Sequence, residues 1–184
     1  MSINNQKVVD LCKKEKHLRL YTEGDRQWIA TSGSVYPLLK APHLDESSLR
    51  ALYSIPDNVR VDAVEGLPGA FSFADAVRYE QPVFYEKIQL QPLEEELALL
   101  RTSQGVTFIR EQYLKPLEKG ENGPADLYER INENGLTYIV AKQGLMLEAV
   151  ILPMRRVIRE GFLEDLKDLF VALKRTFEKE RDAE

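Results

Sequence analysis

The sequence contains very few of the residues that form disulfides and common metal sites. Cys12 is the only cysteine among 184 residues, and His17 and His43 are the only histidines. A single cysteine excludes an intramolecular disulfide and any site that needs several thiolates. Neither histidine has partners at the spacing of a zinc motif or a catalytic triad. We therefore expect no metal and no cofactor, a buried or half-buried structural thiol at Cys12, and surface positions for both histidines.

Long apolar runs are also missing. No segment is apolar over the ~18 residues that a membrane span requires, and the polar start of the chain does not resemble a secretory signal. We expect a cytoplasmic protein outside the membrane. Hydrophobic residues make up 43% of the chain and charged residues 30%, as in globular domains. The length suits one domain over residues 1–184.

The first half of the chain, residues 1–56, has the pattern of a helix, three strands and a second helix. Apolar positions place Val8, Leu11 and Cys12 on one face of a helix over residues 3–16. Apolar residues then alternate around two glycine turns between 18 and 39, which predicts an antiparallel three-stranded meander. Asp45 can cap a helix over residues 45–55; its apolar residues, which we expect to be buried, are Leu49, Leu52 and Tyr53.

The second half, residues 83–154, predicts a strand at 83–90, a short helix at 93–100 and a further unit over 106–152. That unit has the order strand, short helix and three strands, with tight turns at Asn134-Gly135 and Gln143-Gly144. Residues 57–82 are the least regular and predict an extended connection between the halves. The fold class that follows is α+β, with two antiparallel three-stranded meanders packed with helices in one core.

The two meanders also resemble each other in sequence. Leu20-Tyr21, Trp28-Ile29-Ala30 and Tyr36-Pro37-Leu38 occur in the same order as Leu127-Tyr128, Tyr138-Ile139-Val140 and Ile151-Leu152-Pro153. These matches suggest a duplication but are short, so the question stays open here. Our predicted core residues are Trp28, Ile29, Leu52, Phe108, Tyr138, Ile139, Val150 and Leu166, although strand alternation prevents Trp28 and Ile29 from facing the same core.

The last part of the chain has the strongest helical pattern, over residues 161–181. The apolar stripe consists of Phe162, Leu166, Leu169, Phe170, Leu173 and Phe177, and such a stripe must be buried against something. Either the helix packs along the sheet of its own domain, which we favour, or it pairs with its copy in a homodimer. A docking element for another protein is the third interpretation.

Positive charge is concentrated in two short segments. Lys13, Lys14, Lys16 and Arg19 form one, and Arg155, Arg156 and Arg159 form the other. Clusters of this kind could contact a DNA backbone or an acidic partner, and solvated surface charges are the alternative. The net charge of −5 argues against nucleic acid binding by the surface as a whole, because affinity for phosphates requires clustered Lys and Arg.

Two segments resemble the last half-domain of bacterial DNA sliding clamps. They are residues 106–117, VTFIREQYLKPL, and residues 149–155, AVILPMR. In that family a strand with a Phe leads into a helix carrying Tyr-Leu, three strands follow, and the final strand ends in Pro-Met-Arg. The resemblance implies paired half-domains and a role in DNA metabolism. This sequence departs from the family in its length for one domain instead of three, in Pro116 within the helix, and in its continuation beyond Met154.

No nucleophile, base and orienting group occur at a recognisable spacing. We therefore expect a non-enzymatic binding or assembly module, associated with DNA-metabolism machinery, that binds a protein partner or a second copy of itself. The alternative is a small hydrolase or nuclease whose carboxylates come together only in the folded chain. The candidates for such a site, by residue type alone, are Asp62, Glu65, Asp75, Glu86 and Glu129.

Overall fold

The computed structural model describes residues 3–88, 96–117 and 125–154. The chain divides after Pro153, and the description below concerns the unit that precedes this point. Among these residues the class is α+β, as predicted, with two short α-helices and two sheets. The expected C-terminal helix over 161–181, with its residues Phe162, Leu166, Leu169, Phe170, Leu173 and Phe177, lies outside the described residues.

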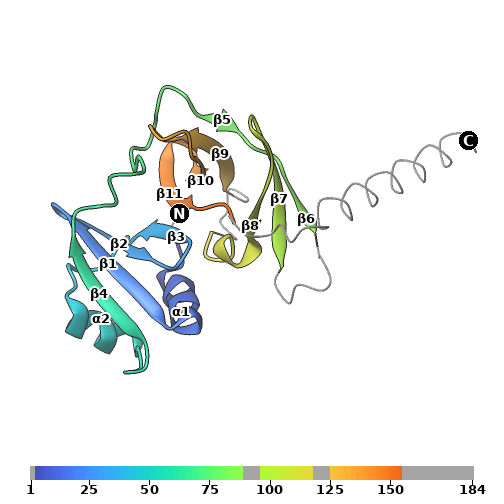
Figure 1. Cartoon of the computed structure of the whole chain (residues 1–184). Coiled ribbons are helices and arrows are strands. Elements are labelled where there is room, and N and C mark those ends of the chain that lie inside the picture. The colour runs from blue at the N-terminus through green and yellow to red at the C-terminus, as the bar shows by residue number, and fades with distance from the viewer. Residues whose placement is uncertain (1–2, 89–95, 118–124, 155–184) are drawn as a thin grey trace, which may run out of the picture. The chain divides into compact units, whose positions relative to one another are not determined.

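The larger sheet has eight strands in the order β4-β1-β2-β3-β11-β10-β9-β5 (Figure 1). Both predicted meanders are present and antiparallel. The first consists of β1 (His17–Glu23), β2 (Arg26–Ala30) and β3 (Ser34–Pro37). The second consists of β9 (Asp126–Ile131), β10 (Thr137–Gln143) and β11 (Met146–Ile151). Antiparallel pairing of β3 with β11, at Val35↔Val150 and Ser34↔Ile151, joins the meanders into one sheet.

The connection between the halves is more regular than predicted. It contains β4 (Arg60–Glu65), which pairs parallel with β1, and ends in β5 (Gln81–Pro82), which pairs antiparallel with β9. The sheet is therefore mixed, with one parallel pair beside the two predicted antiparallel meanders. An edge strand buries little, and in β4 only Val61 is buried, so the hydrophobic alternation that marks a strand is weak.

Both predicted N-terminal helices form within a few residues of the expected bounds. Helix α1 (Asn5–Glu15) begins after Asn4, whose side chain accepts a hydrogen bond from the Lys7 amide. Helix α2 (Glu46–Tyr53) begins at a capping box formed by Asp45. Leu49 of α2 is buried, but Leu52 is 55% exposed, which contradicts its predicted burial. Leu49 and Leu52 are about 60° apart around the helix axis, and the buried stripe of this two-turn helix is narrow enough to include Leu49 alone.

Part of the second half of the chain forms a separate, second sheet. It consists of β6 (Tyr85–Ile88), β7 (Leu97–Thr102) and β8 (Gly105–Arg110) in antiparallel order. The helix predicted over 93–100 is wrong for its described part, because residues 97–100 are all buried within β7. A short, uniformly apolar run fits a buried strand as well as a helix. The predicted strand at 106–109 pairs with β7 and precedes the 3₁₀ helix η1 (Glu111–Tyr113).

The eight-stranded sheet has an apolar cluster on each face. One cluster contains Ile29 and Ile139 with residues of α1, β7 and β8. The other contains Trp28, Tyr138 and Val150. Trp28 is 4% exposed and Ile29 is 1% exposed. Because side chains alternate along β2, these two neighbours are buried in different clusters, one on each face of the sheet.

The remaining predicted core and structural residues have mixed outcomes. Phe108 is half-buried, and Leu166 lies outside the described part of the chain. Cys12 is buried, as predicted, and burial raises the pKa of its thiol. No helix within the described residues is long and apolar enough to cross a membrane.

Candidate functional site

A cavity in the described part of the chain is built on the β1–β2 hairpin. In the antiparallel register Glu23 is opposite Arg26, and Tyr21 is opposite Trp28. Because side chains alternate along a strand, Glu23, Arg26 and Trp28 lie on one face of the hairpin. The turn between the strands contains Gly24, whose φ of +58° favours glycine. The hairpin therefore presents an indole with two opposite charges beside it.

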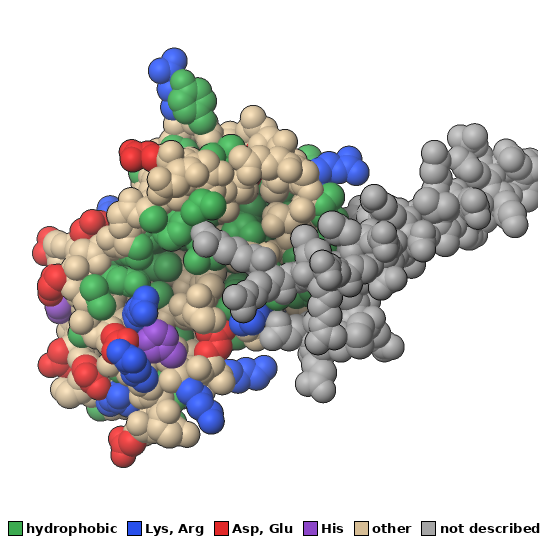
Figure 2. Space-filling view, in the orientation of Figure 1, with side chains coloured by type: hydrophobic (Ala, Val, Ile, Leu, Met, Phe, Trp, Pro, Cys, Tyr) green, Lys and Arg blue, Asp and Glu red, His purple; other side chains and the backbone are tan. Residues whose placement is uncertain are grey.

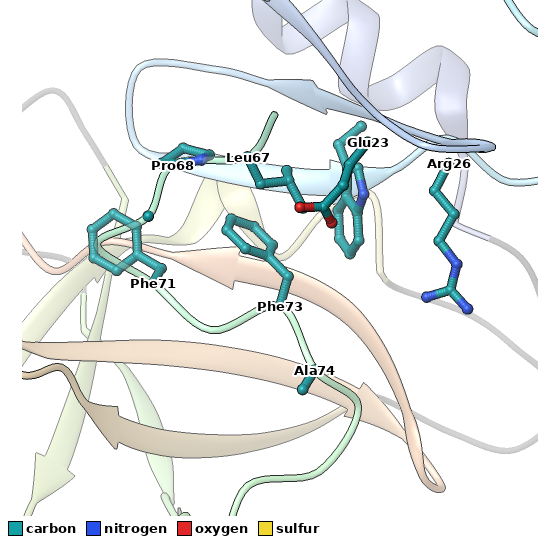
Figure 3. A pocket seen from close by; sticks show the side chains of 9 residues that line it. Glu23, Arg26, Leu67, Pro68, Phe71, Phe73 and Ala74 are labelled. Carbon is teal, nitrogen blue, oxygen red and sulfur yellow. The ribbon is translucent and has the colours of Figure 1, made fainter. Parts of the chain in front are cut away.

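The opposite wall of the cavity comes from the connection between the halves. Leu67, Pro68, Gly69, Phe71, Phe73 and Ala74 line a volume of about 360 Å³ together with Glu23, Arg26 and Trp28 (Figure 3). We call this volume the Trp28 cavity. The rings of Trp28 and Phe73 meet edge to face with centroids 5.1 Å apart. Aromatic walls with a few polar groups are typical of sites that bind small organic ligands.

The wall is fastened to the second meander. The Ser72 amide donates to the Tyr138 hydroxyl at 3.1 Å, and the Phe71 and Tyr138 rings meet edge to face at 5.2 Å. Arg130 donates to the carbonyls of Ser72 and Ala74 at 3.1 and 2.9 Å. These contacts hold the 67–74 segment in a fixed position over the sheet, although it has no regular secondary structure.

Glu80, Arg130 and Lys142 form a buried ionic network beside this wall. Arg130 is 1% exposed and donates to Glu80 Oε2 from Nε at 3.0 Å and from a terminal nitrogen at 2.7 Å. Lys142 donates to Glu80 Oε1 at 2.5 Å. Burial alone would raise the pKa of Glu80, but the hydrogen bonds from Lys142 and Arg130 outweigh it and lower the pKa. One carboxylate thus neutralises part of the charge of two buried cations.

Three polar groups of the Trp28 cavity are left without partners inside the described chain. The Trp28 indole N–H is buried and has no acceptor there. The side chains of Glu23 and Arg26 are exposed and make no hydrogen bond or ion pair with any described residue. Figure 3 shows the Glu23 carboxylate directed towards Leu67 and Phe73, while Arg26 extends away from them. Opposite charges on neighbouring strands therefore remain apart at the mouth of the cavity.

The predicted basic cluster is only partly available. Lys14, Lys16 and Arg19 are exposed around the end of α1 and the start of β1. Lys13, however, pairs with Asp10 at 3.4 Å, and Arg19 approaches Asp62 at 3.9 Å. Figure 2 shows charges of both signs mixed over the end of the molecule that carries α1, α2 and β4. Arg155, Arg156 and Arg159 lie outside the described residues.

Three of the five acidic residues considered for an enzyme site, Asp62, Asp75 and Glu129, make structural contacts. Asp62 binds His17 at 3.0 Å and Arg60 at 2.9 Å, and the hydrogen bond from His17, followed by that from Arg60, lowers the pKa of Asp62. Asp75 accepts from the Leu147 amide at 2.9 Å. Glu129 accepts from the Ser103 amide at 2.7 Å. Within the described ranges, no three His, Cys, Asp or Glu side chains lie close enough together to hold a metal.

Sequence reasoning did not find the Trp28 cavity, because its two walls are about 40 residues apart in the chain. It treated Trp28 as a core residue and residues 57–82 as an extended connection. Phe71 and Phe73, which alternate within that connection, were the available signal, since aromatic residues in an irregular segment need a surface to cover.

No family model matches the chain, and no curated protein or solved structure compared with it matches either. Arguments about function therefore rest on the chemistry of the residues described above.

Proposed function

We propose that this chain is a non-enzymatic binding module whose recognition site is the Trp28 cavity. The observation that carries the proposal is the lining of this cavity, in which the Trp28 and Phe73 rings lie beside the unpaired charges of Glu23 and Arg26. Apolar walls with a few polar groups are typical of sites that bind small molecules. The Trp28 indole N–H has no acceptor among the described residues and is fully buried, so it lies behind the cavity wall and is not a contact for a ligand.

The surroundings of the indole support recognition rather than turnover. Glu23 and Arg26 offer opposite charges beside an aromatic surface, and neither makes a hydrogen bond or ion pair with a described residue that could activate it. The nearby Glu80, Arg130 and Lys142 direct their hydrogen bonds at each other and at backbone carbonyls. We assign these three residues to holding the 67–74 wall in place.

The setting in DNA-metabolism machinery is also a proposal, and the clamp-like segments are its basis. The order strand, short helix and three strands occurs from β8 to β11, as in that family. In this setting the module works in the cytoplasm and assembles with a protein partner or a second copy. If the chain assembles with a second copy, the stripe from Phe162 to Phe177 is the segment that we propose for the contact.

The binding proposal has a direct test, because Trp28 is the only tryptophan in the chain. Its fluorescence reports on the cavity without a label. We expect a screen of small organic molecules and short peptides to yield ligands that shift this emission and raise the Tm of the full chain. Gly69 lines the cavity and has no atom within 4 Å of an added Cβ, so Gly69→Leu should fill the cavity and abolish both effects.

Ala70→Leu is the matched control, because Ala70 is exposed and does not line the cavity. Ligands should bind this variant as they bind the parent chain. The proposal is wrong if no compound changes the Trp28 emission, or if binding survives Gly69→Leu unchanged.

A second proposal, DNA binding, follows from the exposed Lys14, Lys16 and Arg19. Binding of a labelled duplex, followed by fluorescence anisotropy, should weaken steeply with salt as counterions are released. Replacing Lys14 and Lys16 by Ala should reduce the salt slope by about two, whereas Arg78→Ala on the connection should not. Salt-insensitive binding, or none at low salt, removes this proposal.

A further inference from the structure

We infer that the ligand of the Trp28 cavity is a small zwitterion with an apolar body, of the class of the free aromatic and large aliphatic amino acids. This inference rests on the proposed function and names the chemistry that the site selects. It starts from Glu23 and Arg26, which are register partners across the hairpin.

Cross-strand partners in an antiparallel pair have Cβ atoms about 5 Å apart. Opposite charges at that separation would ordinarily pair with each other. Glu23 and Arg26 do not pair, and Figure 3 shows their charged ends pointing in different directions. The arrangement leaves one anionic and one cationic group with a gap between them, which suits a ligand head that carries both charges.

The head group of an α-amino acid satisfies both unpartnered charges at once. Its ammonium donates to the Glu23 carboxylate. Its carboxylate accepts from the Arg26 guanidinium. A singly charged ligand would leave either Glu23 or Arg26 without a partner.

The apolar lining selects the rest of the ligand. Leu67, Phe71 and Phe73 are all half-buried and line the cavity, so an apolar side chain placed among them removes further surface from water. The volume of about 360 Å³ lies at the lower end of the range for small-molecule sites. A single amino acid suits that volume better than a large cofactor does.

Five probes separate the contributions of the head group in titrations of the full chain, followed by Trp28 fluorescence and calorimetry. They are L-phenylalanine, L-leucine, phenethylamine, 3-phenylpropionate and N-acetyl-L-phenylalanine amide. We expect both amino acids to bind. Each singly charged analogue should bind at least about tenfold more weakly than L-phenylalanine, because one charged hydrogen bond is lost. The uncharged amide should be the weakest.

Two surface variants assign each charge. Glu23→Gln should weaken L-phenylalanine binding about tenfold and leave 3-phenylpropionate unchanged, and Arg26→Gln should weaken L-phenylalanine equally and leave phenethylamine unchanged. Both residues are exposed, so neither substitution should impair folding. Asp25→Asn, in the same turn but not lining the cavity, is the control that should change nothing.

The zwitterion inference and the proposed function fail differently. If the N-acetyl amide binds as tightly as L-phenylalanine, the site accepts a peptide side chain; the zwitterion inference is then wrong while the binding function stands. Binding of L-phenylalanine that is insensitive to both Glu23→Gln and Arg26→Gln also overturns the inference. If neither these probes nor the wider screen perturbs Trp28, both are wrong.

Discussion

Replacing Glu80 by Gln tests how the wall of the Trp28 cavity is held. The substitution keeps the shape of the side chain and one carbonyl oxygen but removes the only carboxylate seen to neutralise Arg130 and Lys142 among the described residues. These two side chains are 1% and 4% exposed. Removing one partner of a buried ion pair usually costs 3–5 kcal/mol, roughly, because the remaining charge is left uncompensated.

The structure favours the lower end of that range. Arg130 would keep its hydrogen bonds to the carbonyls of Ser72, Ala74 and Asp75, and the Gln carbonyl could still accept from one of the two cations. We therefore expect Glu80→Gln to lower the free energy of unfolding by about 3 kcal/mol. That is a large part of the roughly 5–15 kcal/mol of a typical domain.

The pH dependence should change as well. The pKa of Glu80 is lower in the folded chain than its ordinary value, so its ionised form stabilises the fold above the unfolded pKa of about 4.3. This stabilisation is lost as pH falls through the lower, folded pKa. The parent chain should therefore lose stability below about pH 4.3 through this group, and the Gln variant should lack that component.

Urea denaturation followed by circular dichroism at pH 7 and at pH 3 measures both effects. Glu133→Gln is the control, because Glu133 is exposed and should change stability by no more than about 0.5 kcal/mol. A loss below about 1 kcal/mol for Glu80→Gln would refute the reasoning that these cations depend on Glu80.

Three further predictions concern stability and assembly. Burial raises the pKa of Glu148, which is 6% exposed. The ionised form of Glu148 therefore destabilises the folded chain, and Glu148→Gln should raise the Tm at pH 7. The same substitution should change the Tm little at pH 4, where the carboxyl group is largely protonated. An Ala Cβ at Gly33 would lie 2.9 Å from the Tyr113 ring, so Gly33→Ala should cost about 1–3 kcal/mol in urea unfolding, whereas Gly69→Ala should not. Deleting residues 161–184 should leave an unfolded or insoluble remnant if that segment packs on its own domain, and a folded monomer if it mediates self-association. Circular dichroism and light scattering distinguish the two results, and a folded remnant with the oligomeric state of the parent chain would contradict both.

The elements that the sequence predicted well are those marked by local turn chemistry. Gly24, Gly135 and Gly144 all have positive φ in hairpin turns, and the strands on either side follow from alternation. Asp45 likewise predicted where α2 begins. The errors fall where burial overrides local preference. Residues 97–100 form a strand because a sheet neighbour covers them on both sides, which no local pattern shows.

The candidate site was harder to predict because its parts come together only through tertiary packing. Glu80 and Lys142 are 62 positions apart, and neither has a distinctive sequence context. Trp28 was expected to be buried, but an indole in a core does not by itself indicate a missing acceptor. Whether the Trp28 N–H finds an acceptor depends on the segment that covers Trp28. That segment, 67–74, has no sequence periodicity that predicts its position over β2.

The sequence similarity between the two meanders shows where the two halves differ beside the Trp28 cavity. Paired positions of the two meanders face the same clusters: Ile29 and Ile139 face one, and Trp28 and Tyr138 face the other. This agreement of faces, together with the mirrored strand order around β3 and β11, is what a duplication would produce. The halves differ at the polar ends of the two aromatic residues. The Tyr138 hydroxyl is satisfied by the Ser72 amide at 3.1 Å, whereas the Trp28 N–H has no acceptor in the described chain. A single segment, 67–74, covers both positions but supplies a hydrogen bond to only one. The unpaired donor is therefore specific to the first meander, where Glu23 and Arg26 also lie.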